Sequence, residues 1–222
     1  NLTVNLPFKE EFDDLLAFQV RQVEKLGVRF ELNRTVDEAF IDQVKPDAII
    51  IATGSRPIIP AIPGIEHPQV CGAEEILAGA PFGKKIAVIG GGAVGCEVAE
   101  LLADRGANVT VIEMLDDAAK DVGMLERALL MQRLKERNVT ILTKTVVSEV
   151  TPEGDLVLEK DCGKETAKGF DTIVTCVGYQ PVTVLSETLQ EKGIPFVSIG
   201  DCVKARKVID AVWEAFQQAY LL

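Results

Sequence analysis

The stretch KIAVIGGGAVG at residues 85–95 decides the fold of this chain. Five mostly apolar residues precede glycines at positions 90, 92 and 95, which is the G-x-G-x-x-G spacing of a dinucleotide-binding turn. Gly90 allows a tight turn, Gly92 lets the backbone approach a pyrophosphate, and Gly95 lets the next helix pack closely on the strand. The stretch therefore predicts a strand over 85–89, a helix over 93–105 and a pyrophosphate site between them.

An acidic residue completes this pattern. Glu113 lies 23 residues after Gly90, at the end of a second predicted strand over 108–113. A carboxylate there can accept hydrogen bonds from both ribose hydroxyls, whereas a 2′-phosphate would meet a like charge. Residues 114–117, MLDD, supply no compensating cation. NAD(H) is therefore favoured over NADP(H); a glycine-rich turn without a ligand is the alternative.

Outside this turn, strands and helices alternate. Apolar spacing predicts further helices over 7–26, 36–44, 124–137 and 208–222, and strands over 28–32, 47–53, 139–142, 171–177 and 194–199. Short β segments are predicted near 146–150, 155–159 and 165–168, while residues 55–81, rich in Pro and Gly, are predicted to be a connection. This alternation predicts an α/β fold with parallel sheets and right-handed crossovers.

Composition limits the partners. The chain has 222 residues, which corresponds to one large or two small domains, and a net charge of -11. Nucleic acids and anionic membranes need a basic surface, so neither is expected as a partner. No apolar run reaches the roughly 18 residues of a membrane span. A phosphorylated ligand remains compatible, because backbone N–H groups can bind it without Lys or Arg.

Cysteine and histidine usage disfavours several kinds of site. The five cysteines never fall at C-x-x-C spacing, which argues against a zinc ribbon, an iron–sulfur site or a redox dithiol. Their odd number and scatter suit reduced thiols, so we expect a cytoplasmic protein. Cys96 and Cys176 are expected to be buried small residues. The single histidine, His67, is expected to be solvated, and we predict neither a catalytic residue nor a metal site.

Three more segments place glycine directly after a predicted strand. They are Ala52-Thr53-Gly54, the segment TCVGYQP at residues 175–181, and Gly200-Asp201. Ligands of α/β proteins bind at the carboxyl ends of strands, although each segment alone could be an ordinary strand-ending turn. Their order around the predicted dinucleotide unit is more specific than any of them singly.

That order resembles the two-dinucleotide-binding-domain flavoproteins, in which an NAD(P) domain interrupts an FAD domain marked by A-T-G and G-D. The chain is most similar to the C-terminal region of NADH:flavin oxidoreductases that carry an N-terminal FMN barrel. These include 2,4-dienoyl-CoA reductase, 2-enoate reductase, NADH oxidase and trimethylamine dehydrogenase. The subgroup is indicated by PFKEE at 7–11, KPD at 45–47 and GDCVKARKVIDA at 200–211.

The resemblance implies a domain organisation. An NAD domain over 81–169, built as a Rossmann-like parallel sheet with a β-meander, would be inserted in a partial FAD-binding Rossmann-like domain formed by 1–80 and 170–222. The FAD domain would lack its own strand and G-x-G-x-x-G turn. Because Asn1 is not Met, we expect a fragment that begins inside the FAD domain and binds FAD poorly, with binding of NAD, ADP or AMP surviving better.

The resemblance also implies contacts for each cofactor. Asp201 would bind the ribitol or pyrophosphate region of FAD, or else only cap a helix. Amides of Val208 and Ile209 would face the flavin pyrimidine edge. Glu97 would lie near the nicotinamide, or else be an ordinary solvated helix residue. The complete expected cofactor-binding set is Gly90, Gly91, Gly92, Ala93, Val94, Gly95, Glu97, Glu113 and Gly178 for NAD, and Ala52, Thr53, Gly54, Gly200, Asp201, Val208 and Ile209 for FAD.

The function implied is that of a redox module. It would pass a hydride from NADH to FAD, and electrons onward to a missing N-terminal part holding FMN and a 4Fe-4S cluster, so the isolated chain is expected to be inactive. The alternative is a non-redox module that holds ADP, as in trimethylamine-dehydrogenase-like proteins. The final electron acceptor and the oligomeric state stay open.

Overall fold

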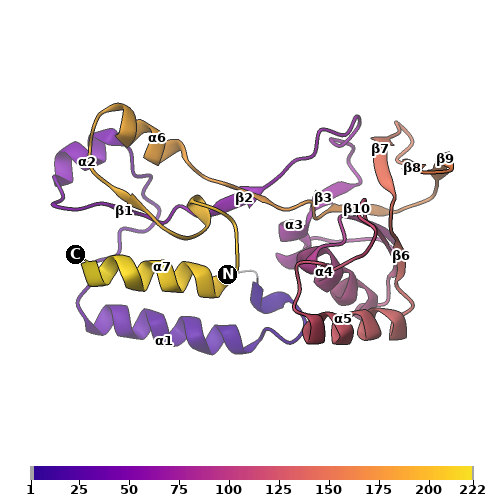
Figure 1. Cartoon of the computed structure of the whole chain (residues 1–222), viewed down its shortest axis with the longest axis horizontal. Coiled ribbons are helices and arrows are strands. Elements are labelled where there is room, and N and C mark those ends of the chain that lie inside the picture. Colours follow the sequence, from indigo (N-terminus) through magenta and orange to yellow (C-terminus); the bar gives the residue numbers. More distant parts are fainter. Residues whose placement is uncertain (1–2, 222) are drawn as a thin grey trace. The chain divides into compact units, whose positions relative to one another are not determined.

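The computed structural model describes residues 3–221, so Asn1 and Leu222, named in the expectations above, lie outside the described residues. The chain divides into two compact units (Figure 1). Unit 1 comprises Asn1–Gly27 and Ile59–Gly178, and unit 2 comprises Val28–Ile58 and Tyr179–Leu222. Each unit is formed by two separate stretches of the chain.

Unit 1 is built on a five-stranded parallel sheet in the order β3-β10-β4-β5-β6. Its strands are β3 (Val70–Gly72), β4 (Lys85–Ile89), β5 (Asn108–Ile112), β6 (Thr140–Leu142) and β10 (Thr172–Thr175). The helices that connect them are α3 (Ala73–Leu77), α4 (Ala93–Asp104) and α5 (Met124–Glu136). The parallel α/β fold class is thereby confirmed.

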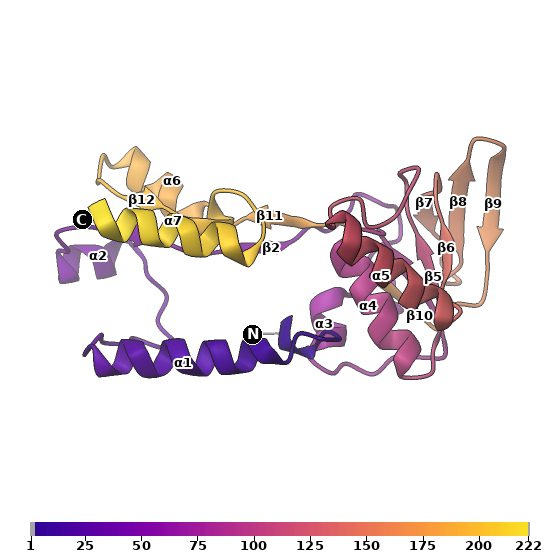
Figure 2. The ribbon, with the colours of Figure 1, turned by 60° about the horizontal axis from the view of Figure 1, so that its bottom comes forward.

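Both faces of this sheet are buried, as expected of parallel strands. Along β4, Ile86 and Val88 belong to one apolar core together with residues of α3, α4 and α5. The alternate residues Ala87 and Ile89 belong to a second core, against an antiparallel meander (Figure 2). The meander strands are β7 (Val146–Val150), β8 (Leu156–Lys160) and β9 (Gly163–Ala167). Unit 1 therefore has three layers: helices, sheet and meander.

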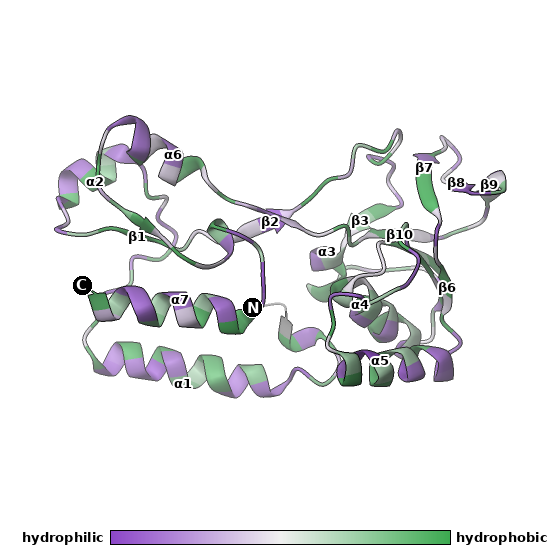
Figure 3. Cartoon of the chain, in the orientation of Figure 1, coloured by the Kyte–Doolittle hydropathy of each residue, from purple (hydrophilic) through white to green (hydrophobic). Residues whose placement is uncertain are grey.

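The N-terminal stretch of unit 1 contains η1 (Thr3–Asn5) and α1 (Glu11–Lys25). The helix predicted from residue 7 begins later, because Phe8 adopts the left-handed conformation with φ 62°. Apolar residues alternate with polar ones along α1 (Figure 3), but none of its described side chains is buried. The Asn5 side-chain amide donates to the carbonyl of Leu77 at 2.8 Å and ties this stretch to α3.

Unit 2 has less regular structure. The strands β1 (Ile50–Ile51) and β12 (Val197–Ser198) pair in parallel, and β2 (Ser55–Pro57) pairs antiparallel with β11 (Tyr179–Pro181). The helices are α2 (Glu38–Val44), α6 (Val184–Glu191), the short η2 (Gly200–Cys202) and α7 (Val208–Leu221). A small core gathers Ile41, Ile51, Leu189 and Cys202. Two-stranded sheets are marginal by themselves, so unit 2 depends on this small core.

Several predicted elements differ in the structure. Residues 28–32 form no strand: they are exposed and have no neighbouring strand with which to pair. The strands predicted over 47–53 and 194–199 shrink to the two-residue β1 and β12. The segment 55–81, predicted as a connection, contains β2, β3 and α3, and α6 lies in a stretch for which no element was predicted. Their existence depends on distant partners, such as β10 for β3, which local patterns do not reveal.

The unit boundaries also differ from the expected domains of 81–169 and of 1–80 with 170–222. Unit 1 extends over 59–178 because β10 lies between β3 and β4, which places both the expected connection and the expected FAD strand in its sheet. Residues 3–27 belong to the same unit. The assignment of these stretches to an NAD domain and an FAD domain stays a prediction.

Candidate functional site

The glycine turn between β4 and α4 has the geometry that its sequence predicts. Gly90 has φ +102°, and a Cβ added there would lie 2.3 Å from the carbonyl oxygen of Cys176. A Cβ on Gly95 would lie 2.0 Å from the carbonyl oxygen of Gly90. Both distances forbid a side chain, so α4 approaches the strands as closely as backbone permits. Gly92 is the N-cap of α4 and has no side chain with which to cap it.

Glu113 lies directly beside this turn. The residue is 7% exposed, and its Oε2 accepts a hydrogen bond from the amide of Gly91 at 2.6 Å. Its Oε1 accepts from the amide of Leu115 at 2.7 Å. A carboxylate has about four acceptor positions, so capacity for ribose hydroxyls remains. The predicted ribose ligand and the predicted phosphate turn are therefore one contiguous site.

A second carboxylate at this turn was missed from the sequence. The amide of Ala93, in the first turn of α4, donates to both carboxylate oxygens of Asp121, at 2.9 and 3.1 Å. Asp121 comes from the loop between β5 and α5, 28 residues further along the chain. No spacing rule links the two residues, because the contact depends on how that loop folds back over the turn.

Glu97 and Gly178 lie in the same unit. The side chain of Glu97 on α4 forms an ion pair with Lys9 at 3.0 Å and is 20% exposed. It is therefore a partly buried, paired group rather than a freely solvated one. Gly178 has φ +100° and follows β10 two residues after Cys176, whose carbonyl closes on Gly90. The roles of Glu97 and Gly178 toward nicotinamide stay predictions.

The thiols beneath the turn are unreactive in character. Cys96 is buried, and Cys71 and Cys176 are partly buried. Burial raises the pKa of Cys96 and of Cys176 to about 12, and that of Cys71 to about 11. The thiol of Cys96 also donates to the carbonyl of Gly91 at 3.4 Å. They are small packing residues, as predicted for Cys96 and Cys176.

In unit 2 the structure brings together the A-T-G and G-D segments. The carboxylate of Asp201 accepts from the hydroxyl of Ser55 at 3.3 Å and from the amide of Arg206 at 3.2 Å. The hydroxyl of Thr53 donates to the carbonyl of Val182 at 2.8 Å. Gly54, with φ +72°, has open space where a Cβ would stand. Both segments follow the parallel strands β1 and β12 at their carboxyl ends, with Ala52 and Gly200 beside them.

Polar contacts join α7 to the residues that precede it. The amide of Gly200 donates to Glu214 at 2.7 Å, and Glu214 also pairs with Arg206. Those two contacts hold the pKa of Glu214 below its usual range. Val208 and Ile209 are 53% and 68% exposed at the first turn of the helix. Their predicted contact with the flavin remains a prediction.

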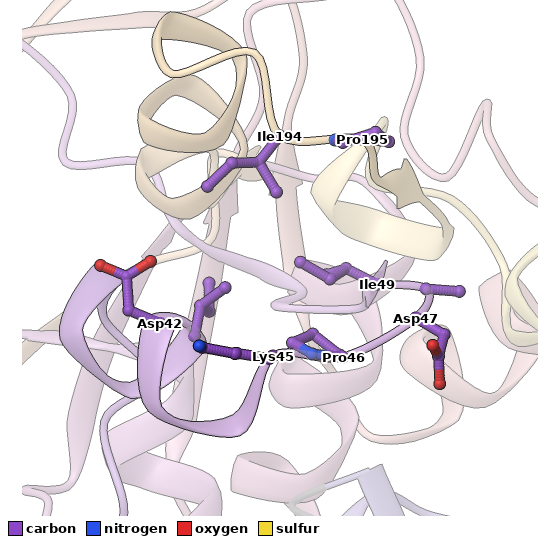
Figure 4. A pocket seen from close by; sticks show the side chains of 9 residues that line it. Asp42, Lys45, Pro46, Asp47, Ile49, Ile194 and Pro195 are labelled. Carbon is purple, nitrogen blue, oxygen red and sulfur yellow. The ribbon is translucent and has the colours of Figure 1, made fainter.

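A groove of about 340 Å³ in unit 2 lies away from the predicted residues (Figure 4). Ile49 and Ile194 line it together with Lys45 and Pro46. It opens beside the beginning of β1, whereas Thr53 and Gly54 follow that strand's other end. Because ligands of α/β sheets bind at the carboxyl ends of strands, the groove is separate from the predicted cofactor site.

Over residues 3–221 no group of three His, Cys, Asp or Glu side chains could hold a metal ion. His67 is partly buried rather than fully solvated, and its Nδ1 accepts from the amide of Gln69 at 3.3 Å. Within the described part of the chain no helix is both long and apolar enough to cross a membrane.

The parallel sheet, the glycine turn and the carboxylate after β5 define unit 1 as a Rossmann-type nucleotide-binding fold. The sequence profile of the family described as pyridine nucleotide-disulphide oxidoreductase matches residues 7–204. The chain therefore belongs to this family, and the resemblance inferred from the motifs is confirmed.

Known relatives support this family assignment. The chain is 38% identical over 205 residues to an NADH oxidase of Thermoanaerobacter brockii, covering 90% of the chain and 31% of that protein. It is 33% identical over 219 residues to a bilirubin reductase of Mediterraneibacter gnavus, covering 97% and 34%. It thus spans about a third of the length of these curated relatives.

Solved structures show the same fold. A 2-naphthoyl-CoA reductase complex superposes with a TM-score of 0.89 at 27% identity, covering 97% of this chain and 33% of that one. Histamine dehydrogenase from Rhizobium sp. 4-9 gives a TM-score of 0.84 at 16% identity, covering 100% and 38%. The second likeness concerns the fold alone.

Proposed function

We propose that this chain is the pyridine-nucleotide and flavin module of an NADH-dependent flavoprotein oxidoreductase. The observation that carries the proposal is the position of Glu113, whose carboxylate lies against the glycine turn at 2.6 Å from the Gly91 amide. When bound, NADH would supply a hydride and FAD would accept it. The protein's own contribution is to bind and orient these two dinucleotides.

The pyrophosphate of NAD would bind at the residues Gly90–Gly95. Because the glycines of this turn have no side chains, backbone N–H groups and the positive end of α4 could face the phosphates. No Lys or Arg would then be required. Glu113 would accept from the adenosine ribose. Gly91, Ala93 and Val94 belong to the same turn and helix start, while Glu97 and Gly178 would lie toward the nicotinamide.

The surroundings of Glu113 favour NADH over NADPH. A 2′-phosphate would need a free cation near this carboxylate. Lys120 and Arg127 lie in the following loop and helix, but Lys120 pairs with Asp116 and Arg127 pairs with Asp117. The two cations that follow Glu113 in this loop and helix are thus both paired with acidic side chains.

FAD would bind in unit 2 at the carboxyl ends of β1 and β12. Asp201 would accept from its ribitol or pyrophosphate region, Thr53 and Gly54 would lie against its phosphates, and the first turn of α7 would face the flavin. The likeness to a much longer NADH oxidase and bilirubin reductase supports a larger assembly. We propose that electrons pass onward to a domain with FMN and a 4Fe-4S cluster.

A second function is a module that holds ADP without redox chemistry. It is favoured by the contrast between the five-stranded parallel sheet of unit 1 and the two-stranded parallel pair of unit 2. A complete nucleotide fold beside a small one suits tight adenine-nucleotide binding without a second flavin. Purified protein containing ADP and no FAD would favour this alternative.

Calorimetric titration of the chain with NADH and NADPH tests the main proposal. NADH should bind more tightly, and Glu113→Ala should weaken it by about tenfold or more, since hydrogen bonds to a carboxylate are strong. The control is Glu153→Gln, an exposed carboxylate in the turn between β7 and β8. Tighter binding of NADPH, or unchanged NADH affinity in Glu113→Ala, would contradict the proposal.

A further inference from the structure

The N-terminus of α4 already has an anion in this structure. The first amides of a helix lack intrahelical acceptors, and the N-cap Gly92 has no side chain to satisfy them. The carboxylate of Asp121 takes that place, with both oxygens within 3.1 Å of the Ala93 amide nitrogen. The same amide would serve the pyrophosphate of a bound dinucleotide.

The carboxylate also lies over the glycine that opens the site. The position of a Cβ on Gly92 is 3.5 Å from Oδ2 of Asp121 and 3.7 Å from Oδ1, in ordinary van der Waals contact. Asp121 therefore lies beside the space that Gly92, having no side chain, would leave for a phosphate. The carboxylate of Asp121 and a phosphate bound to the same amide would repel each other, and this repulsion grows as the distance between them shortens.

The loop that carries Asp121 is anchored to the turn. The amide of Ala119 donates to the carbonyl of Gly91 at 2.7 Å, and Ala119 adopts the left-handed conformation with φ 52°. The carbonyl of Ala118 accepts from Arg127 at 2.8 Å. Asp121 itself is exposed, so its side chain can rotate into solvent while the buried residues Ala118 and Ala119 keep the loop in place.

We propose that Asp121 is an internal competitor for the pyrophosphate: its carboxylate caps α4 when the site is empty and is displaced when a dinucleotide binds. This rests on the proposed function of the glycine turn. Asp121 thereby lowers the affinity for every ligand with a phosphate at this turn, and it leaves ligands without phosphate unaffected. It acts on affinity and touches no reacting atom.

The test is a set of calorimetric titrations of the full chain with NADH, ADP-ribose and adenosine. Asp121→Asn keeps an oxygen that can accept from Ala93 but removes the charge. It should bind NADH and ADP-ribose about two- to tenfold more tightly than the unchanged chain, the range expected for one charge at a helix end. Adenosine affinity should not change.

The matched control is Asp116→Asn. It removes one negative charge from the same loop, but from a side chain that pairs with Lys120. If Asp121→Asn and Asp116→Asn bind ADP-ribose equally, or Asp121→Asn binds it more weakly, Asp121 is not a competitor. If the unchanged chain and both variants bind neither NADH nor ADP-ribose, the proposed function and this inference both fall.

Discussion

At the scale of single residues, two carboxylates occupy the amides of one glycine turn. Glu113 accepts from Gly91, and Asp121 accepts from Ala93. Hydrogen bonds to charged acceptors stabilise a turn more than neutral ones do. The contrast lies in exposure, because Glu113 is buried and Asp121 is exposed. Burial therefore restricts the side chain of Glu113, whereas that of Asp121 has solvent around it.

The thiols offer a prediction at this scale. At pH 8 a thiol with a pKa of about 12 is ionised in roughly one molecule in ten thousand, and only the thiolate reacts. A disulfide reagent should therefore react rapidly with exposed Cys162 and slowly with Cys71, Cys96 and Cys176. Cys162→Ser should remove the rapid phase, and urea should expose the remaining thiols. A rapid phase that persists in Cys162→Ser would contradict this.

The same pKa shifts give the direction of a pH effect. In the unfolded chain these thiols ionise near their ordinary pKa of 9.0, whereas burial keeps them protonated in the folded chain. The unfolded state then binds fewer protons, so stability declines as the pH rises above about 9. Well below pH 9 these thiols are protonated in both states, so their ionisation should add no pH dependence to the free energy of unfolding.

At the scale of elements, an ion-pair cluster fixes α4 against α5. Glu100 on α4 is fully buried, and its Oε1 lies 2.6 Å from Nε of Arg133 and 3.5 Å from Nη1 of Arg137. Arg137 also binds Asp104 at 2.6 Å, which raises the pKa of its guanidinium. The ring of Phe8 lies 4.8 Å from the Arg133 guanidinium carbon. The cluster thus links both helices to the N-terminal stretch.

Glu100→Gln should lower the free energy of unfolding by about 2–4 kcal/mol, since removing one partner leaves buried or half-buried charge uncompensated. Urea denaturation followed by circular dichroism measures this. Glu136→Gln, on the exposed side of α5, is the control and should change stability by less than about 0.5 kcal/mol. Equal effects of the two substitutions would show that burial of Glu100 contributes little.

At the scale of the whole molecule, the two units differ in how their sheets are built. Unit 1 has a five-stranded parallel sheet buried on both faces, whereas unit 2 has two-stranded pairs and a small core. The hydrogen bonds of buried strands break only when much of the unit unfolds, whereas those of short strand pairs break in local unfolding. The units should therefore differ in local stability.

Hydrogen exchange followed by mass spectrometry tests this difference. Amides of β4 and β5 should exchange far more slowly than those of β1 and β12, because the inner strands are paired on both sides. Peptides from α5, which lies at the surface of the same unit, provide an internal reference. Equal protection of β4 and β1 would contradict the difference in stability.

Local patterns predicted much of the molecule, including β4, β5, α4, α5 and the meander, each within a few residues. Strands β4 and β5 and helix α4 are rich in apolar residues that are buried in the fold, and short turns separate the strands of the meander. Other elements were predicted poorly: β3 lies in the Pro- and Gly-rich connection, α6 was missed although its apolar residues fall on one face, and residues 28–32 alternate but have no partner strand. A strand needs a neighbour, and a neighbour can be distant in sequence.

The sequence by itself determined the family, the glycine turn and the acidic residue after β5, because glycine spacing and strand–helix alternation are local properties of the chain. Only the tertiary structure decided that Asp121 reaches Ala93, that Glu97 pairs with Lys9, and that β3 joins β10 at the sheet edge. Each of these contacts joins residues 28 or more positions apart. Such contacts depend on how loops and elements pack, and no local period encodes that.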